Sequence, residues 1–292
     1  MFAGTFTAII TPFKEGQIDE AAFRKLIEIQ IEGGVEGIVP VGTTGESPTV
    51  NRREHLEIIR IAVEAVAGRI LVIAGTGANS TSEAIYLTEE AEKLGADASL
   101  QVTPYYNKPS QEGLFQHFKA VAECTKLPIM LYSVPGRSVV SILPETAGRL
   151  AEECTNILSI KEAGGDPDRV DLLKASLPDD FPILSGDDPL TIEFMKRGAV
   201  GLVSVTSNII PRAMSNLVRA MNAGDVEKAQ AIHDKEEDLM LTLMGIDTNP
   251  VPIKAAVALM GHCEHEIRLP LVTLDPEKKE TVYNLLKKHK LV

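Results

Sequence analysis

Lys161 is the residue of this sequence best placed for covalent chemistry. It closes the apolar run Ile157–Ile160, which is typical of a buried strand, and a Gly164-Gly165 turn follows it. A lysine at the end of a buried strand loses part of its hydration, and this favours the neutral amine, which is a nucleophile. We therefore predict imine chemistry at Lys161 with a ketone or an aldehyde. Taken alone, the residue also fits a salt-bridged or solvent-facing lysine at a strand end.

Other strand-like runs end in groups that complement such an amine. The Gly42–Gly45 segment has glycine at both ends, so its backbone permits close approach, and Thr43 and Thr44 are predicted to bind a carboxylate. Tyr132 is placed to pass protons to and from the carbinolamine and imine of the lysine. Arg137 offers paired N–H donors for a second carboxylate. Taken alone, the Gly42–Gly45 segment also fits an ordinary turn into a helix, and Tyr132 also fits a tyrosine packed in the core.

Eight strand-like runs alternate with longer segments of helical period, which predicts a (β/α)8 barrel. Continuous apolar character within the runs favours a parallel sheet covered by helices. A doubly wound sheet is the competing architecture. The predicted strands are Gly4–Ile10, Gly37–Val41, Ile70–Gly75, Ala98–Thr103, Pro128–Ser133, Ile157–Lys161, Ile183–Gly186 and Gly201–Thr206. The clearest predicted helices between them are Ala21–Glu32, Arg53–Ala67, Ser82–Leu94 and Gln111–Thr125.

The C-terminal part of the sequence reads as helices without strands. Helical segments are predicted at Asp225–Met244, Pro252–Met260 and Pro276–His289. We therefore predict a catalytic barrel over residues 1–223 and a helical extension over residues 224–292. Within the barrel, Asp188-Pro189 is predicted to start a helix, with the aspartate as N-cap.

Composition limits the kinds of partner. The chain has 292 residues, 44% of them hydrophobic, which is enough for a large core. Its 41 acidic and 29 basic side chains give a net charge of -12, which argues against nucleic acid or an anionic membrane as the main partner. No apolar run approaches a membrane span, and the first residues enter a strand without a basic and apolar leader. We expect a soluble, cytoplasmic protein.

Neither a metal nor an organic cofactor is expected. The three cysteines Cys124, Cys154 and Cys263 are far apart in the sequence, so they suggest neither a disulfide framework nor a zinc site. The His262–His265 segment places its polar side chains in different directions, which suits chelation poorly. The Gly75–Ala78 turn lacks the third glycine and the downstream acid of a dinucleotide site. The loop after the eighth strand is not rich in glycine, so a non-phosphorylated keto acid is the better substrate class.

These motifs resemble the pyruvate-dependent class I aldolases of the N-acetylneuraminate lyase superfamily and, within it, the dihydrodipicolinate synthase family. The resemblance covers essentially the whole chain, from the Gly4–Phe13 segment to the Asn249–Lys254 segment. It implies a lyase that condenses pyruvate with L-aspartate 4-semialdehyde in the diaminopimelate route to lysine. Ser133 departs from the family pattern, where asparagine is usual, and Val139 stands where glycine is common.

The resemblance also implies a role for each matching residue. Lys161 forms the Schiff base, Thr44 and the backbone around Val203 hold pyruvate, and Gly186 lies beside the site. Tyr132 is the proton donor and acceptor, and Thr43 and Tyr106 complete a proton relay with it. In the family that second tyrosine comes from a neighbouring subunit, which implies a homotetramer built as a dimer of dimers. Arg137 binds the semialdehyde and disfavours sister enzymes that act on sugar acids.

A regulatory site for L-lysine at a dimer interface is a further implication. The matching residues are Ser47, Val50, His55, Asn79, Glu83 and Tyr105. Pro48 and Arg52 stand where many lysine-sensitive members carry alanine and histidine, so we predict weakened or altered inhibition.

Two alternatives to the condensing enzyme remain at the level of sequence. One is a sister aldolase that cleaves a sugar acid or a hydroxy-keto acid to pyruvate. The other is a non-catalytic protein that binds keto acids on the same scaffold.

Overall fold

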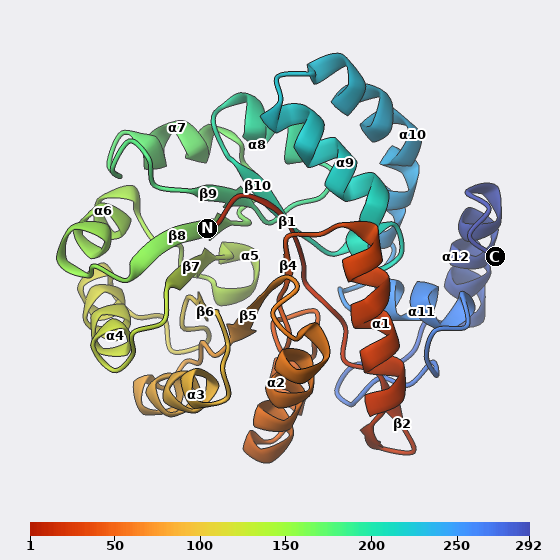
Figure 1. Ribbon diagram of the computed structural model, residues 1–292, viewed down its shortest axis with the longest axis horizontal. Coiled ribbons are helices and arrows are strands. Elements are labelled where there is room, and N and C mark those ends of the chain that lie inside the picture. The colour runs from red at the N-terminus through yellow and green to blue at the C-terminus, as the bar shows by residue number, and fades with distance from the viewer.

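The computed structural model describes residues 1–292 and contains a closed barrel of eight parallel strands (Figure 1). Around the barrel the strands follow the order β1, β10, β9, β8, β7, β6, β5, β4. Their bounds are β1 Gly4–Thr7, β4 Gly37–Ile38, β5 Leu71–Gly75, β6 Ala98–Val102, β7 Ile129–Ser133, β8 Ile157–Glu162, β9 Ile183–Ser185 and β10 Gly201–Ser204. All eight predicted strands are present, so the barrel is confirmed and the doubly wound sheet is wrong.

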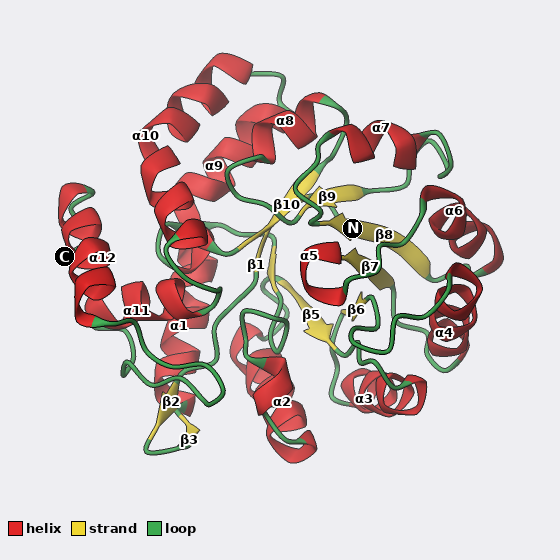
Figure 2. Ribbon diagram, turned by 180° about the vertical axis from the view of Figure 1, so that it is seen from behind, coloured by secondary structure: helices red, strands yellow, loops and turns green.

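Helices surround the barrel, and all of them except one short helix at its mouth, α5 (Pro135–Ser138), bury a face against it (Figure 2). Those of the barrel are α1 Glu20–Gly33, α2 Arg52–Val66, α3 Thr81–Lys93, α4 Gln111–Glu123, α5 Pro135–Ser138, α6 Pro144–Glu153, α7 Asp168–Lys174, α8 Thr191–Lys196 and α9 Pro211–Asn222. Two single turns of 3-10 helix occur at Ser47–Thr49 and Thr206–Asn208. Helix α2 begins at a capping box, in which the Asn51 and Glu54 side chains each accept a hydrogen bond from the other residue's N–H group.

The interior of the barrel is a small apolar core of its own. Twelve buried residues form it, and they lie in β1, β5, β6, β7, β9 and β10 or close to the ends of β1, β4 and β7. Phe2 and Phe6 belong to this cluster, and Tyr132 and Val203 do as well. Side chains that face inward at the carboxyl ends of the strands therefore meet over a packed floor.

Two local features differ from expectation. The hairpin of β2 (Phe13–Lys14) and β3 (Gln17–Ile18) was not predicted, because two-residue strands are too short to show a period. The N-cap prediction for Asp188 was wrong, since α8 begins later and its N-cap residue is Leu190. The Asp188 carboxylate instead accepts hydrogen bonds from Ser204 Oγ and from the N–H groups of Val205 and Thr206.

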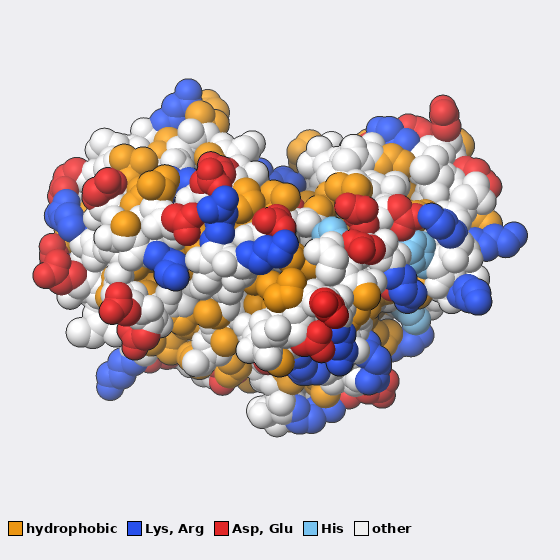
Figure 3. All heavy atoms as spheres, turned by 90° about the horizontal axis from the view of Figure 1, so that it is seen from above, with side chains coloured by type: hydrophobic (Ala, Val, Ile, Leu, Met, Phe, Trp, Pro, Cys, Tyr) orange, Lys and Arg blue, Asp and Glu red, His pale blue; other side chains and the backbone are white.

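The three predicted C-terminal helices are also present. They are α10 Val226–Gly245, α11 Val251–Leu259 and α12 Pro276–Lys288, and α12 lies to the side of the barrel beyond α11 (Figure 1). The division of the chain between residues 223 and 224 stays a prediction. No helix combines the length and the apolar character needed to cross a bilayer. Figure 3 shows acidic and basic side chains interspersed over one face of the molecule.

Candidate active site

The side chains of Lys161 and Tyr132 meet inside the mouth of the barrel. The two residues are register partners on the parallel strands β8 and β7. Lys161 Nζ lies 4.1 Å from the centroid of the Tyr132 ring. Both side chains are buried, with residue exposures of 5% for Lys161 and 6% for Tyr132. The structure thus brings the predicted nucleophile and the predicted proton carrier together.

Gly186 leaves the space that the lysine side chain occupies. A Cβ atom built on Gly186 would lie 2.7 Å from Lys161 Cε and 2.6 Å from the Cβ of Ala163. Only a residue without a side chain fits there. Val203 is buried on β10, and its side chain belongs to the inner core below the site.

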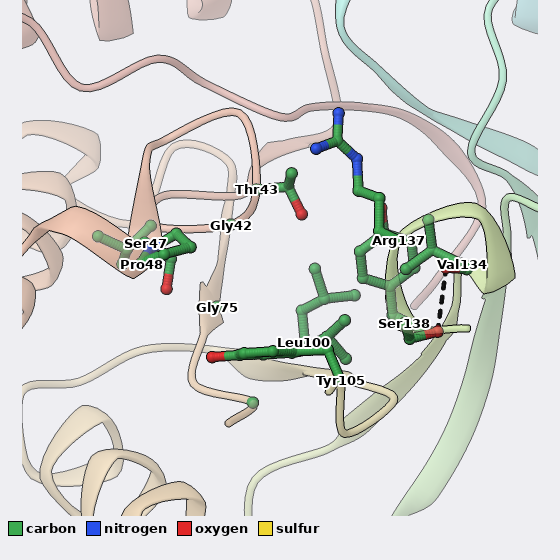
Figure 4. A pocket seen from close by; sticks show the side chains of 14 residues that line it. Gly42, Thr43, Ser47, Pro48, Gly75, Leu100, Tyr105, Val134, Arg137 and Ser138 are labelled. Atoms are coloured by element: carbon green, nitrogen blue, oxygen red, sulfur yellow. Dashed lines mark hydrogen bonds between the residues drawn. The ribbon is translucent and has the colours of Figure 1, made fainter. Parts of the chain in front are cut away.

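The loop after β4 brings the two threonines to this region. Val41 and Glu46 have φ angles of 47° and 59°, so the loop turns sharply on both sides of the threonine pair. Thr43 lines a cavity of about 210 Å³ together with Tyr132 and Arg137. Figure 4 shows Thr43, Ser47 and Pro48 on one side of this cavity and Arg137 on the other.

Thr44 is held differently from its neighbour. It is 2% exposed, and its Oγ1 accepts a hydrogen bond of 3.0 Å from Asn249 Nδ2. Asn249 lies between α10 and α11, so the C-terminal part of the chain reaches the site.

The short helix α5 carries Arg137 over the mouth of the barrel (Figure 2). Ser138 Oγ donates a hydrogen bond of 3.0 Å to the carbonyl oxygen of Val134, drawn as a dashed line in Figure 4. The Arg137 side chain is exposed, and its Nη2 donates to the main-chain oxygen of Asn249 at 3.0 Å. Its remaining N–H donors stay available to a ligand.

Tyr106 is not part of this cluster within one chain. Its residue exposure is 89%, its φ angle is 75°, and it does not line the cavity that contains Tyr132. The structure therefore separates Tyr106 from the other predicted catalytic residues.

Two buried carboxyl groups lie near Lys161. Burial raises the pKa of Asp188, while its hydrogen bonds and the positive charge of Lys161 favour the carboxylate. Burial also raises the pKa of Glu162, against the opposing charge of Arg169, whose Nη2 lies 3.3 Å from Glu162 Oε2. These two acids hold the ends of β10 and β8 in place.

The family comparison agrees with this geometry. The sequence model of the dihydrodipicolinate synthetase family matches residues 1–289 of this chain. This chain belongs to the dihydrodipicolinate synthetase family. The resemblance inferred from the motifs is confirmed, and the chain is an enzyme of this family.

Individual members of the dihydrodipicolinate synthetase family are similar over their full length. The 4-hydroxy-tetrahydrodipicolinate synthase of Citrifermentans bemidjiense is 50% identical over 292 residues, which are 100% of both chains. The crystal structure of the dihydrodipicolinate synthase of Aquifex aeolicus has a TM-score of 0.98 and 46% identity, and covers 99% of each chain. The structure of the enzyme from Methylacidiphilum fumariolicum SolV has a TM-score of 0.96 and 52% identity, over 100% of this chain and 98% of that one.

The residues predicted to bind L-lysine gather at a second cavity, which has a volume of about 300 Å³. Five of the six line it, namely Ser47, Val50, His55, Glu83 and Tyr105. The sixth, Asn79, donates from Nδ2 to the main-chain oxygen of Tyr105 at 3.2 Å. Arg52 lines the same cavity, and its Nε lies 3.0 Å from Glu83 Oε1. Glu83 is thus paired within the chain.

Two residues near the site had no predicted role. Asn249 contacts Thr44 and Arg137, and Lys254 forms a buried ion pair with Glu46. Both belong to the Asn249–Lys254 segment, in which an asparagine and a lysine stand among prolines and apolar residues. The sequence did contain a signal for this ion pair. A buried charge requires a partner, and Lys254 stands in an apolar helical segment.

Proposed function

We propose that Lys161 forms the imine in the condensation of pyruvate with L-aspartate 4-semialdehyde to 4-hydroxy-tetrahydrodipicolinate. This is the reaction of the family, and it belongs to the diaminopimelate route of lysine biosynthesis. The observation that carries the assignment is the contact between the Lys161 amine and the Tyr132 ring inside the barrel mouth. A related enzyme from Acinetobacter baumannii, 45% identical with a TM-score of 0.96, was solved in complex with pyruvate.

The proposed reaction proceeds through covalent intermediates on the lysine. The neutral Lys161 amine attacks the keto carbon of pyruvate, and the carbinolamine loses water to give an iminium ion. The iminium withdraws electrons, so the methyl carbon loses a proton and an enamine forms. That carbon attacks the aldehyde carbon of the semialdehyde, whose oxygen takes up a proton. The semialdehyde amine then attacks the imine carbon, which closes the ring and releases Lys161.

Each neighbouring residue has a proposed part in these steps. Tyr132 carries protons to and from the carbinolamine and the enamine, with Thr43 next to it in the relay. Thr44 and the backbone at Val203 bind the pyruvate carboxylate. Arg137 binds the carboxylate of the semialdehyde with the N–H donors that Asn249 leaves free.

Gly186 and Tyr106 have proposed roles of a different kind. Gly186 makes room for the lysine and its imine. The exposure of Tyr106 supports a site completed by a second copy of the chain, which would supply this tyrosine to the relay. We therefore propose a homotetramer built as a dimer of dimers, and a cytoplasmic location stays a prediction.

We also propose that L-lysine binds at the cavity lined by Glu83 and Tyr105. A related enzyme from Cyanidioschyzon merolae, 38% identical with a TM-score of 0.96, was solved with lysine bound. In this chain Arg52 already pairs with Glu83, which would otherwise be free to bind the ammonium group of the inhibitor. Inhibition by lysine is therefore proposed to be weak.

The direct test combines turnover with imine trapping. Product formation from pyruvate and aspartate 4-semialdehyde is followed by coupling to an NADPH-dependent reductase, and borohydride traps the pyruvate imine at Lys161. Turnover that disappears in Lys161→Ala supports the proposal. Trapping without turnover would overturn the choice of aldehyde and favour a sister aldolase, and absence of trapping would overturn the imine mechanism and favour a keto-acid binding protein.

A further inference from the structure

Asn249 contacts both groups that are proposed to bind substrate carboxylates. Its side-chain Nδ2 donates to Thr44 Oγ1 at 3.0 Å, and its main-chain oxygen accepts from Arg137 Nη2 at 3.0 Å. Thr44 follows β4 and Arg137 lies in α5, so one residue of the C-terminal segment joins two segments of the barrel mouth that are far apart in the sequence.

The contact with Thr44 determines how that hydroxyl group can act. A threonine hydroxyl has one proton to donate and lone pairs that accept. Because the Asn249 amide donates to the oxygen of Thr44, the hydroxyl proton is directed elsewhere. Thr44 is 2% exposed and its hydroxyl donates to no protein group, so the proton is free for the carboxylate of a bound keto acid.

The side-chain oxygen of Asn249 indicates that the contact of Asn249 with Thr44 does more than stabilise the fold. Its Oδ1 is buried and has no hydrogen-bond partner. An unpaired buried amide oxygen costs free energy, and such atoms are uncommon in native proteins. Stability alone therefore does not explain an asparagine at this position.

A buried ion pair next to both residues holds this arrangement. Lys254, one turn into α11, pairs with Glu46, and each side chain is 1% exposed. Glu46 follows Thr44 by two residues, and its second oxygen accepts from the N–H of Arg268 at 3.0 Å. The threonine loop and the asparagine are thereby tied to each other.

We propose that Asn249 is a positioning residue, which directs the Thr44 hydroxyl proton toward the carboxylate of pyruvate and steadies the Arg137 guanidinium. The inference rests on the proposed function and adds to it that the C-terminal segment sets substrate affinity. It also predicts an unequal effect on the two substrates, because a substitution removes the side-chain contact with Thr44 but keeps the main-chain contact with Arg137.

The test measures KM for each substrate in Asn249→Ala and Asn249→Asp. In Asn249→Ala, KM for pyruvate is expected to rise about tenfold, and KM for the semialdehyde by less than about threefold. In Asn249→Asp the new carboxylate accepts the Thr44 proton and repels the carboxylate of pyruvate, so KM for pyruvate rises further, by about 100-fold. The aspartate variant is nearly isosteric, and it keeps the test decisive if the alanine variant does not fold.

A double-mutant cycle with Thr44→Val separates positioning from a general structural effect. In that background Asn249→Ala is expected to change KM for pyruvate by less than about twofold, because the hydroxyl is already gone. Asn222→Ala is the matched control, since Asn222 Nδ2 donates to the carbonyl oxygen of Val200 away from the site. An unchanged KM for pyruvate in Asn249→Ala, or full additivity with Thr44→Val, would overturn the inference.

The same variants also separate this inference from the proposed function. The pyruvate concentration that gives half-maximal borohydride trapping at Lys161 reports the Asn249 effect without the second substrate. If wild-type enzyme traps pyruvate but does not condense it with the semialdehyde, the proposed function fails, and the shift in trapping still decides the role of Asn249.

Discussion

The Lys161 side-chain nitrogen lies 4.1 Å from the centroid of the Tyr132 ring because the two residues are register partners on adjacent parallel strands. Parallel pairing points both side chains into the barrel at the same height. A shift of one residue in either strand would turn one of them outward. The chemistry proposed here therefore depends on strand register as much as on residue type.

Removing only the hydroxyl of Tyr132 should separate imine formation from proton transfer. Tyr132→Phe keeps the ring packed beside Lys161, so borohydride should still trap pyruvate on the lysine. Turnover is expected to fall by about 10²–10⁴-fold, which is typical for the loss of a general acid–base group. Steady-state kinetics with parallel trapping checks this, and near-normal kcat would show that another group carries the protons.

A methyl group at Gly186 should block the lysine. Gly186→Ala places Cβ 2.7 Å from Lys161 Cε, so the lysine must move away from its position. Imine formation with pyruvate is expected to slow by about tenfold or more. Gly245→Ala is the control, because nothing lies within 4 Å of a Cβ at Gly245. Equal trapping rates in the two variants would contradict the close contact.

Breaking the buried ion pair should cost more stability than removing it completely. Lys254→Met leaves the Glu46 carboxylate buried without its partner, and the free energy of unfolding is expected to fall by about 3–5 kcal/mol. The double variant Glu46→Gln, Lys254→Met should recover part of this loss. Denaturant unfolding measures both. A double variant less stable than Lys254→Met would contradict this prediction, because it would show that the Glu46 carboxylate is stabilised without Lys254.

Burial of His117 should make stability depend on pH. Burial lowers the pKa of His117 from 6.5 to about 4 in the folded chain, and the residue is 6% exposed. Between these values the unfolded chain binds a proton that the folded chain does not, so this contribution is complete above pH 6.5 and is lost as the pH falls toward 4. It amounts to about 3 kcal/mol at most. His117→Gln should flatten the unfolding free energy in this range, whereas parallel curves for both proteins would refute the assignment.

Releasing Glu83 should strengthen inhibition by lysine. Arg52→His removes the guanidinium that lies 3.0 Å from Glu83, so the carboxylate becomes available to the ammonium group of lysine. The concentration of L-lysine for half-maximal inhibition is expected to fall severalfold in this variant. Arg52→His combined with Glu83→Gln should lose the gain. Identical inhibition curves for wild type and Arg52→His would remove Glu83 from the proposed lysine site.

Local sequence patterns were sufficient for the eight barrel strands and for the long helices named from the sequence, but not for the β2–β3 hairpin. The strands are short apolar runs between turns, and helices such as α1 and α2 begin at polar caps, so both kinds of signal are contained in neighbouring residues. Strand lengths were overestimated where apolar residues continue into a loop. Predicted strand Gly37–Val41 ends at Ile38, because the chain leaves the sheet and Val41 adopts a positive φ angle.

The sequence by itself determined the barrel, the family and the residue types available at the strand ends, because apolar period and motif spacing are local properties of the chain. The sequence also predicted that Tyr132 serves Lys161, and only the tertiary structure decided how closely the predicted residues meet and which others join them. It set Tyr132 beside Lys161 through strand register, and it brought Asn249 to Thr44 from the C-terminal segment. It also left Tyr106 exposed on the outside. Contacts between residues far apart in the chain depend on how helices and strands pack together, and no local pattern contains that information.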